Sequence, residues 1–338
     1  MATLNSERTI EKALAAIRAQ DYPQDQVEIL VVDGGSTDRT REIAKKFSCR
    51  ILDNPKVEPV AAKIIGIREA TGDYLVYHDS DEVMEDTGAL QKRAAALFEN
   101  PDVFAVFAEG YRTPTGLSFV NAYINEFGDP FSMFYYRLSK DYRFFPHDIL
   151  KFCLRKKETN LYRVYETRPD RPQPIMETAA QASAIDLAFF RKNFSDLLDK
   201  PWGLVHFFYH MQTHTRKFAV TRNDPVAHYS ADHWSGYLRK IRSRVLNNIF
   251  QKESLAAAGF TGRAQFEPVL RRAKRFAFLP YALLGFPLFV DCIRYMITRR
   301  DWRYIAVFPL TLYTAFSICW YLLLKWTGYR PVQKGYGV

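Results

Sequence analysis

The chain has 338 residues, of which 48% are hydrophobic and 25% charged, and this balance excludes intrinsic disorder for the chain as a whole. Its length corresponds to about two domains. The 47 Lys and Arg residues outnumber the 37 Asp and Glu residues, a surplus that suits nucleic acid, anionic lipid or phosphate-bearing substrates. The four cysteines lie far apart in the sequence and match no zinc or redox spacing, which favours a reducing compartment.

The first hundred residues alternate between short apolar runs and helical patterns. The apolar runs predict buried strands at 27–32, 50–52, 74–77 and 103–108. Helical spacing predicts helices at 10–17, 38–47, 60–70 and 87–99. This alternation predicts an α/β fold on a parallel sheet, which binds ligands at the carboxyl ends of its strands. Since the chain opens directly on a loop and a helix, we expect the strand that normally comes first to be missing.

Two acidic motifs follow predicted strands, VVDGGSTD at residues 31–38 and HDSDE at residues 78–82. The second contains a D-x-D, formed by Asp79 and Asp81. Two carboxylates in such a loop can hold a hard divalent cation that takes its other ligands from phosphate oxygens. A D-x-D alone is common in surface loops, but its position after an apolar strand, downstream of the first motif, makes it a strong signal.

These motifs resemble those of family 2 glycosyltransferases, which have the GT-A fold. TLNSERTIEKALAAIRAQDYP is similar to that family's opening loop and first helix. VEILVVDGGSTDRTREIA and PVAAKIIGIREATGDYLVYHDSDE are similar to its next strand and to its D-x-D region. The similarity is close over residues 3–86 and looser to about 245. It implies a GT-A nucleotide-diphospho-sugar transferase fold, with a Rossmann-like mixed sheet and a Mg²⁺ or Mn²⁺ cofactor.

The resemblance also implies roles for individual residues. Asp33 would contact the nucleotide base, with Thr3 and Glu7 nearby. Asp79 would lie by the ribose and near the metal, and Asp81 would bind the metal on the diphosphate. The alternative for Asp33 is a turn carboxylate that caps the following helix.

Two further positions match the family pattern less closely. Lys63 stands where the family often has an arginine, and a cation there would suit the diphosphate. The alternative for Lys63 is a solvated helix residue. His228 matches the histidine that completes the metal shell in GT-A enzymes, and a neutral imidazole is a suitable ligand. The alternative is an ordinary loop histidine.

The chain departs from the family at the catalytic base. Inverting members carry a Glu-Asp pair some twenty residues before that histidine, whereas this chain has Leu204 and Val205 near that position. Asp199 could act as the base after a small shift, or His206 could replace it. A lipid phosphate acceptor would need less deprotonation. A degenerate, inactive protein is the remaining interpretation.

The C-terminal third carries membrane signals. Residues 305–324 are twenty uncharged residues, enough to cross a bilayer core of about 30 Å, and we expect a transmembrane helix. Residues 276–297 form a second candidate, interrupted by prolines and charges. It would be a second span, a re-entrant segment or an interfacial helix. Residues 235–250 have an apolar side and an arginine-rich side, typical of a helix lying on anionic lipid.

We therefore expect a GT-A catalytic domain at 1–234, basic interface helices at 235–275, a membrane segment of one or two helices at 276–326 and a short tail at 327–338. The expected activity is inverting, metal-dependent transfer of a sugar from a nucleotide-sugar, most simply UDP-linked. The acceptor would be polyprenyl-phosphate-linked or a glycan. The expected location is a membrane, with the catalytic domain in the cytoplasm and no nucleic-acid partner.

Three rival hypotheses are weaker. A catalytically degenerate membrane-bound scaffolding subunit would fit the absent Glu-Asp pair but not the intact D-x-D. A Rossmann dinucleotide enzyme would need a G-x-G-x-x-G after a strand, and the sequence has none. A processive polysaccharide synthase would need more membrane spans and a Q-x-x-R-W-type motif.

Overall fold

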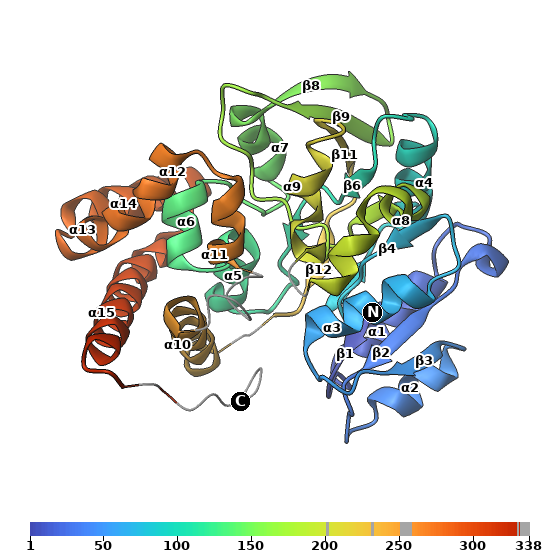
Figure 1. Cartoon of the computed structure of the whole chain (residues 1–338), viewed down its shortest axis with the longest axis horizontal. Coiled ribbons are helices and arrows are strands. Elements are labelled where there is room, and N and C mark those ends of the chain that lie inside the picture. The colour runs from blue at the N-terminus through green and yellow to red at the C-terminus, as the bar shows by residue number, and fades with distance from the viewer. Residues whose placement is uncertain (201–202, 231–232, 251–258, 330, 332–338) are drawn as a thin grey trace. The chain divides into compact units, whose positions relative to one another are not determined.

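The computed structural model describes residues 1–200, 203–230, 233–250, 259–329 and 331 (Figure 1). The chain divides into two compact units. Unit 1 consists of Met1–Thr115 and Lys140–Ser230, and unit 2 consists of Gly116–Ser139 and Ala231–Val338. Unit 2 therefore combines the C-terminal part of the chain with a short segment from its middle.

Unit 1 begins with a small parallel sheet in the order β1-β2-β3. These strands are β1 (Ala2–Thr3), β2 (Leu30–Asp33) and β3 (Arg50–Asp53). The helices in this part of the chain are α1 (Ile10–Arg18), α2 (Thr40–Lys46) and α3 (Pro59–Glu69), with a 3₁₀ turn at Gln24–Gln26.

A six-stranded mixed sheet forms the larger part of unit 1, in the order β4-β10-β6-β11-β9-β8. Its strands are β4 (Tyr74–Val76), β10 (Ala184–Asp186), β6 (Ala105–Phe107), β11 (Lys217–Thr221), β9 (Tyr162–Thr167) and β8 (Cys153–Glu158). Only the β11–β6 pair is parallel, so the expectation of a parallel sheet holds for β1–β3 and not here. A third sheet has the order β5 (Glu82–Met84), β12 (Val226–His228) and β7 (Tyr111–Arg112).

The other helices of unit 1 are α4 (Ala89–Phe98), α7 (Phe145–Asp148), α8 (Leu187–Phe194) and α9 (Phe207–Met211). Three short 3₁₀ segments accompany them, η2 (Ile149–Lys151), η3 (Ser195–Asp199) and η4 (Leu204–His206). The strands and helices predicted within the first hundred residues are all present, with bounds that differ by a few residues.

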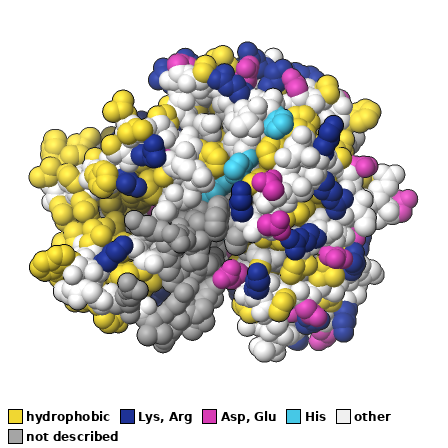
Figure 2. Space-filling view, in the orientation of Figure 1, with side chains coloured by type: hydrophobic (Ala, Val, Ile, Leu, Met, Phe, Trp, Pro, Cys, Tyr) yellow, Lys and Arg dark blue, Asp and Glu magenta, His cyan; other side chains and the backbone are white. Residues whose placement is uncertain are grey.

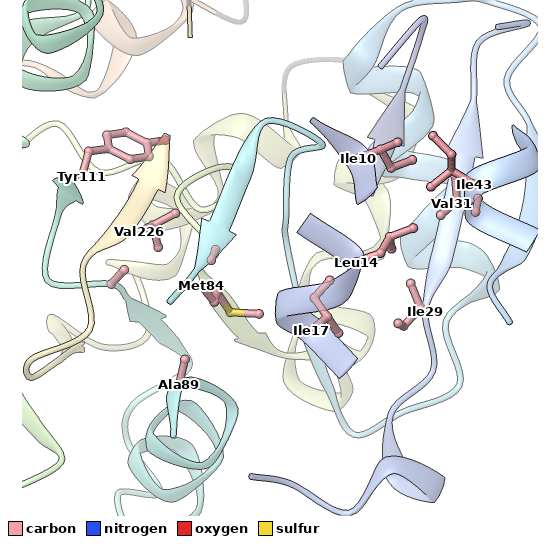
Figure 3. Close-up of a cluster of buried hydrophobic side chains, with 13 residues drawn as sticks. Ile10, Leu14, Ile17, Ile29, Val31, Ile43, Met84, Ala89, Tyr111 and Val226 are labelled. Carbon is pink, nitrogen blue, oxygen red and sulfur yellow. The ribbon is translucent and has the colours of Figure 1, made fainter. Parts of the chain in front are cut away.

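A buried hydrophobic cluster joins α1 to the strands around it (Figure 3). Ile10, Leu14 and Ile17 follow the helical spacing read from the sequence and point toward Ile29 and Val31 (Figure 3). Burial of one such side chain contributes roughly 1.5–3 kcal/mol. This cluster packs α1 against β2, and the opening loop joins β1 to α1.

The expected absence of the first strand is corrected by the structure. Ala2 and Thr3 form β1, which lies parallel to β2 with Ala2 opposite Val32. The prediction failed because two residues are too few to show a strand pattern. Within the described residues β1 pairs with β2 alone, and β4 ends the larger sheet. A cavity of about 500 Å³ is lined by residues of β1, β2 and β4, including Ala2, Leu30 and Leu75.

Unit 2 is helical. Its helices are α5 (Phe119–Phe127), α6 (Pro130–Tyr136), α10 (Trp234–Phe250), α11 (Phe260–Arg263), α12 (Val269–Ala273), α13 (Phe278–Leu283), α14 (Phe286–Arg299) and α15 (Val307–Trp326). Among the residues that the structure describes in this unit, the 3₁₀ segments are η6 (Ala264–Phe266), η7 (Lys274–Ala277) and η8 (Trp302–Ala306). A part of the predicted interface region, residues 251–258, lies outside the described residues, as does most of the predicted tail.

One helix among the described residues is long and apolar enough to cross a membrane, Trp302–Trp326, which comprises η8 and α15. The second predicted segment forms a bent pair, in which Val269–Leu283 meets Phe286–Arg299 at 87°. Length and composition alone admit both a membrane span and the core helix of a soluble protein. Whether either segment spans a bilayer therefore stays a prediction.

We expect Arg93→Met to destabilise unit 1 by about 3–5 kcal/mol, because it leaves the charge of Asp224 buried and unpaired. Arg93 Nη1 lies 2.6 Å from Asp224 Oδ2, and both side chains are almost fully buried. Denaturant unfolding checks this. The matched control is Lys217→Met, which breaks a solvent-exposed pair with Asp102 and should cost less than about 1 kcal/mol. Equal losses in the two variants would contradict the prediction.

Candidate active site

The candidate site lies where several strands of unit 1 end. β1 and β2 are parallel, and their register sets Thr3 opposite Asp33. The D-x-D loop follows β4, and β5 begins directly after it. β5 pairs with β12 so that Glu82 lies opposite His228. Strand pairing thus brings a histidine from the far end of unit 1 to the acidic loop.

The carboxylate of Asp33 is buried and closes the turn that follows β2. It accepts hydrogen bonds from Thr3 Oγ1 (3.2 Å), Gly35 N (3.2 Å) and Ser36 N (3.0 Å), and it pairs with Arg41 Nη1 (3.0 Å). Burial opposes the charged form, but the hydrogen bonds from Ser36, Arg41 and Thr3 outweigh it and lower the pKa of Asp33. Its turn-closing role is therefore present in the structure, and any ligand at this corner meets an ionised carboxylate.

The opening loop is tied to both acidic loops. Glu7 Oε2 accepts from Arg39 N (3.2 Å) and Arg39 Nε (3.3 Å), and Glu7 N donates to Asp38 Oδ2 (3.0 Å). Ser80 Oγ, inside the D-x-D, donates to Ser6 Oγ (2.9 Å). The loop that carries Glu7 is thus held beside both motifs.

Lys63 is an ion-pair partner of the D-x-D and is mostly buried, unlike a solvated helix residue. Its Nζ lies 3.0 Å from Asp79 Oδ1 and also donates to the carbonyl oxygen of Ala179. Lys63 therefore neutralises one carboxylate of the D-x-D. It also links α3 to the 178–183 loop.

Asp81 and His228 lie together. His228 Nε2 is 3.5 Å from Asp81 Oδ2, and Tyr229 N donates to the Asp81 carbonyl oxygen (2.8 Å). The ring of Tyr111 stacks on the His228 ring at 4.7 Å and holds its orientation. Burial lowers the pKa of His228, but its contact with Asp81 and the nearby charge of Glu82 outweigh burial and raise it.

Glu82 is a further site residue, which sequence reasoning quoted within HDSDE without assigning a role. Its buried carboxylate accepts four hydrogen bonds, from Tyr111 Oη (2.8 Å), Gln181 N (2.7 Å), Ala182 N (3.0 Å) and Asp79 N (3.2 Å). Gln181 and Ala182 both have positive φ, 61° and 45°, a backbone conformation that non-glycine residues rarely adopt. Burial and the nearby Asp79 raise the pKa of Glu82 to about 6.

The residues at the D-x-D fit a divalent cation only with help from a ligand. Asp81 and His228 offer one carboxylate and one imidazole at the same point, whereas Asp79 pairs with Lys63. Throughout the described part of the chain, no three His, Cys, Asp or Glu side chains gather to hold an ion. Mg²⁺ and Mn²⁺ accept so few protein ligands when phosphate oxygens and water supply the rest.

The two candidate bases occupy different environments. Asp199 ends η3, where 80% of its side chain is exposed and its Oδ1 lies 3.1 Å from Arg68 Nη2. His206 ends η4 and is fully buried. The structure therefore holds Asp199 at the surface and His206 in the interior.

The stretch that stands in place of the family's acidic pair lies near the site. Thr178 Oγ1 donates to the Leu204 carbonyl oxygen at 3.4 Å, which joins η4 to the 178–183 loop that Glu82 holds. Leu204 is fully buried and Val205 partly so. The segment is thus next to the site, and its side chains are apolar.

Comparison with known proteins supports the sequence resemblance. Residues 1–158 match the family described as glycosyl transferase family 2. Glycosyltransferase AglE of Haloferax volcanii is 36% identical over 83 residues, 23% of this chain and 27% of that protein. A dolichyl N-acetyl-alpha-D-glucosaminyl phosphate 3-beta-D-2,3-diacetamido-2,3-dideoxy-beta-D-glucuronosyltransferase of Methanococcus voltae is 37% identical over 81 residues, 22% of this chain and 25% of that protein. The matched segments span about a quarter of these relatives.

The fold is also found among solved structures. Mannosyltransferase PcManGT from Pyrobaculum calidifontis, solved in complex with GDP-Man and Mn²⁺, superposes with a TM-score of 0.50 and 16% identity. The match covers 95% of this chain and 85% of that one. At this identity the likeness concerns the fold alone, and it confirms the predicted GT-A fold.

We expect Glu82→Gln to destabilise unit 1 by about 1–3 kcal/mol, because the amide NH₂ replaces one carboxylate oxygen that accepts two hydrogen bonds with a group that can only donate. Hydrogen exchange of residues 178–183 should rise with this loss. Thermal unfolding and exchange mass spectrometry check both effects. Glu85→Gln is the matched control, because its pair with Arg112 is partly exposed and should contribute less than about 1 kcal/mol. Unchanged exchange at 178–183 would refute the role of Glu82.

Proposed function

The chain belongs to glycosyl transferase family 2 through residues 1–158, and we propose that it transfers a sugar, with inversion, from a nucleotide-sugar to a lipid-linked or glycan acceptor. The observation that carries this proposal is the pairing of Asp81 with His228 beside Asp79 and Lys63. Carboxylates, an imidazole and a cation at one strand edge suit a metal-bound diphosphate.

The donor side of the proposal rests on the loops around Asp33. Asp33, with Thr3 and Glu7 nearby, would contact the nucleotide base, and Asp79 would lie by the ribose. UDP-sugars are the first donors to test. GDP-mannose is the second, because the solved mannosyltransferase with this fold was obtained with GDP-Man and Mn²⁺.

Asp81 and His228 would bind the divalent cation. Asp79 would join them once phosphate oxygens of the donor replace it as the ion-pair partner of Lys63. A cation bound there neutralises the charge of the leaving diphosphate. Lys63 would then contribute a second positive charge near the same oxygens. Tyr111 keeps the His228 ring in place, and Glu82 keeps the 178–183 loop beside the D-x-D.

We propose a phosphate oxygen of a polyprenyl phosphate as the attacking atom. The segment beside the site carries Leu204 and Val205, so it offers no carboxylate to remove a proton from a hydroxyl. A phosphate is already ionised near neutral pH and needs no base. Asp199 and His206 remain the two base candidates if the acceptor is a glycan hydroxyl.

A polyprenyl acceptor implies a membrane. The apolar helices of unit 2 support attachment to a membrane. The surplus of Lys and Arg supports an orientation in which the catalytic domain lies on the cytoplasmic side. The Methanococcus voltae relative is named for a dolichyl phosphate that already carries a sugar, which supports a lipid-linked acceptor and leaves a sugar hydroxyl as the alternative attacking group.

We expect Asp81→Asn to abolish the Mn²⁺-dependent thermal stabilisation by the donor and to lower transfer by at least about 100-fold, because it removes a charged cation ligand. Asp196→Asn is the matched control, since Asp196 is exposed and pairs with Lys200 at the surface. Full activity in Asp81→Asn would refute the metal assignment. A folded wild-type chain that responds to no nucleotide-sugar would instead favour the degenerate scaffolding protein.

We expect Asp199→Asn and His206→Asn each to lower kcat by less than about tenfold, because a phosphate acceptor needs no general base. Loss of a general base would cost about 10²–10⁴-fold. Rates with polyprenyl phosphate over a range of pH check this, normalised to the folded fraction measured by donor binding. A loss of the larger size in either variant would name that residue as a general base and overturn the base-free mechanism.

A further inference from the structure

Helices of unit 2 bury charged side chains and expose large apolar ones, the reverse of the usual arrangement in a soluble protein. On α14 the buried residues include Asp291, which pairs with Arg137 Nη2 (2.7 Å) and accepts from Tyr281 Oη (2.7 Å). The exposed residues of the same helix include Phe286 at 73% and Ile297 at 70%. A helix that buries ions and exposes large apolar side chains is suited to lipid on its outer side.

The span-length helix α15 shows the same arrangement along one stripe. Its exposed apolar side chains include Phe316, Trp320 and Leu323, whose spacing sets them along one stripe, and Leu322 and Trp326 are exposed near its end. Its buried residues include Thr311 and Thr314, whose hydroxyls donate to their own helix's carbonyl groups. Packing on α6, α10, α13 and α14 covers part of α15, and the exposed stripe is open to lipid.

Helix α10 packs on α15. The Phe119 ring lies 6.4 Å from Trp234, the first residue of α10, and 5.1 Å from Tyr304. At the other end, Lys325 Nζ donates to the Ile249 carbonyl oxygen (3.0 Å), and the Phe250 ring lies 6.3 Å from the Tyr321 ring.

The exposed face of α10 is strongly charged. It carries Arg239, Lys240, Arg242 and Arg244 in the middle of the helix, between the two ends that follow α15. Arg242 Nε donates to Tyr321 Oη (2.7 Å), and Arg244 pairs with Asp129 (3.0 Å). If α15 crossed a bilayer, these cations would be carried into the hydrocarbon, where charged side chains are strongly disfavoured.

We infer that unit 2 binds one leaflet of an anionic membrane and does not span it, with α15 lying in the membrane interface. This inference deepens the membrane attachment proposed above. The surface that meets the lipid, called here the apolar face, is formed by Leu270, Phe276, Leu284, Phe286, Phe289, Ile297, Trp302, Phe316 and Trp320. Figure 2 shows hydrophobic side chains gathered over this part of unit 2.

Charge complementarity points to lipid as the occupant of the apolar face. Residues 269–329 contain nine Lys and Arg but only two Asp and Glu, and one of the two acids is the buried Asp291. Arg275 and Arg294 are exposed beside apolar residues of the face. A basic border suits anionic headgroups, whereas a second copy of the same face would bring like charges together. The 87° bend between α13 and α14 also fits a segment that enters and leaves on one side.

The test uses the full chain bound to sealed phosphatidylcholine vesicles, with and without phosphatidylglycerol. Thr298→Cys and Thr327→Cys introduce exposed thiols near the two ends of the span-length helix. We expect both thiols to react completely with a membrane-impermeant maleimide added outside the vesicles. Phe316→Cys, in the middle of the stripe, should lose its labelling when vesicles are added. The unmodified chain measures the background from its four native cysteines.

Labelling of one of the two end positions only after the vesicles are permeabilised would overturn the inference, because it would show a span. Unchanged labelling of Phe316→Cys on addition of vesicles would overturn it as well. The inference would also be overturned if the chain were a dimer and the Phe316→Cys thiol were protected without lipid. A second copy of the chain would then cover the apolar face. The paired change Arg275→Gln and Arg294→Gln should weaken binding to phosphatidylglycerol vesicles. None of these readouts depends on sugar transfer, so a failed activity assay leaves the result interpretable.

Discussion

The buried carboxylate of Glu82 is the interaction on which the candidate site depends. Its oxygens receive two backbone N–H groups from the 178–183 loop, one from the D-x-D loop and the hydroxyl of Tyr111. Three segments that are far apart in sequence therefore meet at one ionisable group. Burial of that group is unfavourable unless every donor is present, so the loops are held together as a set.

The charges around Glu82 explain how the site tolerates three neighbouring carboxylates. Lys63 neutralises Asp79, and His228 lies against Asp81, so the acidic loop is already partly compensated in the free protein. A metal-bound diphosphate would compete for these same partners. Ligand binding at this edge would therefore exchange ion pairs within the protein for ion pairs with the ligand.

Unit 2 buries ion pairs and exposes apolar side chains. Its interior holds the Arg137–Asp291 pair and the Glu126–Arg299 pair (2.8 Å), while its surface carries aromatic and aliphatic side chains. Such an arrangement satisfies polar groups inside the protein and leaves the apolar ones to another apolar medium. In the proposed function, catalysis would belong to unit 1 and membrane attachment to unit 2, which have different physical requirements.

The sequence alone determined the strands and helices of residues 1–100, the D-x-D, the family and the GT-A fold, because these depend on short-range patterns. It could not reveal β1, which has two residues, or the role of Glu82, which is defined by donors from distant loops. The resemblance predicted His228 at the same metal as Asp81, and the tertiary structure supplied the means, the pairing of β12 with β5. Only packing set α10 along α15, and its charges argue against the span that hydropathy predicted. A hydropathy window describes the residues of one helix only. In a membrane, the charged residues of helices packed on that helix would also have to enter the hydrocarbon.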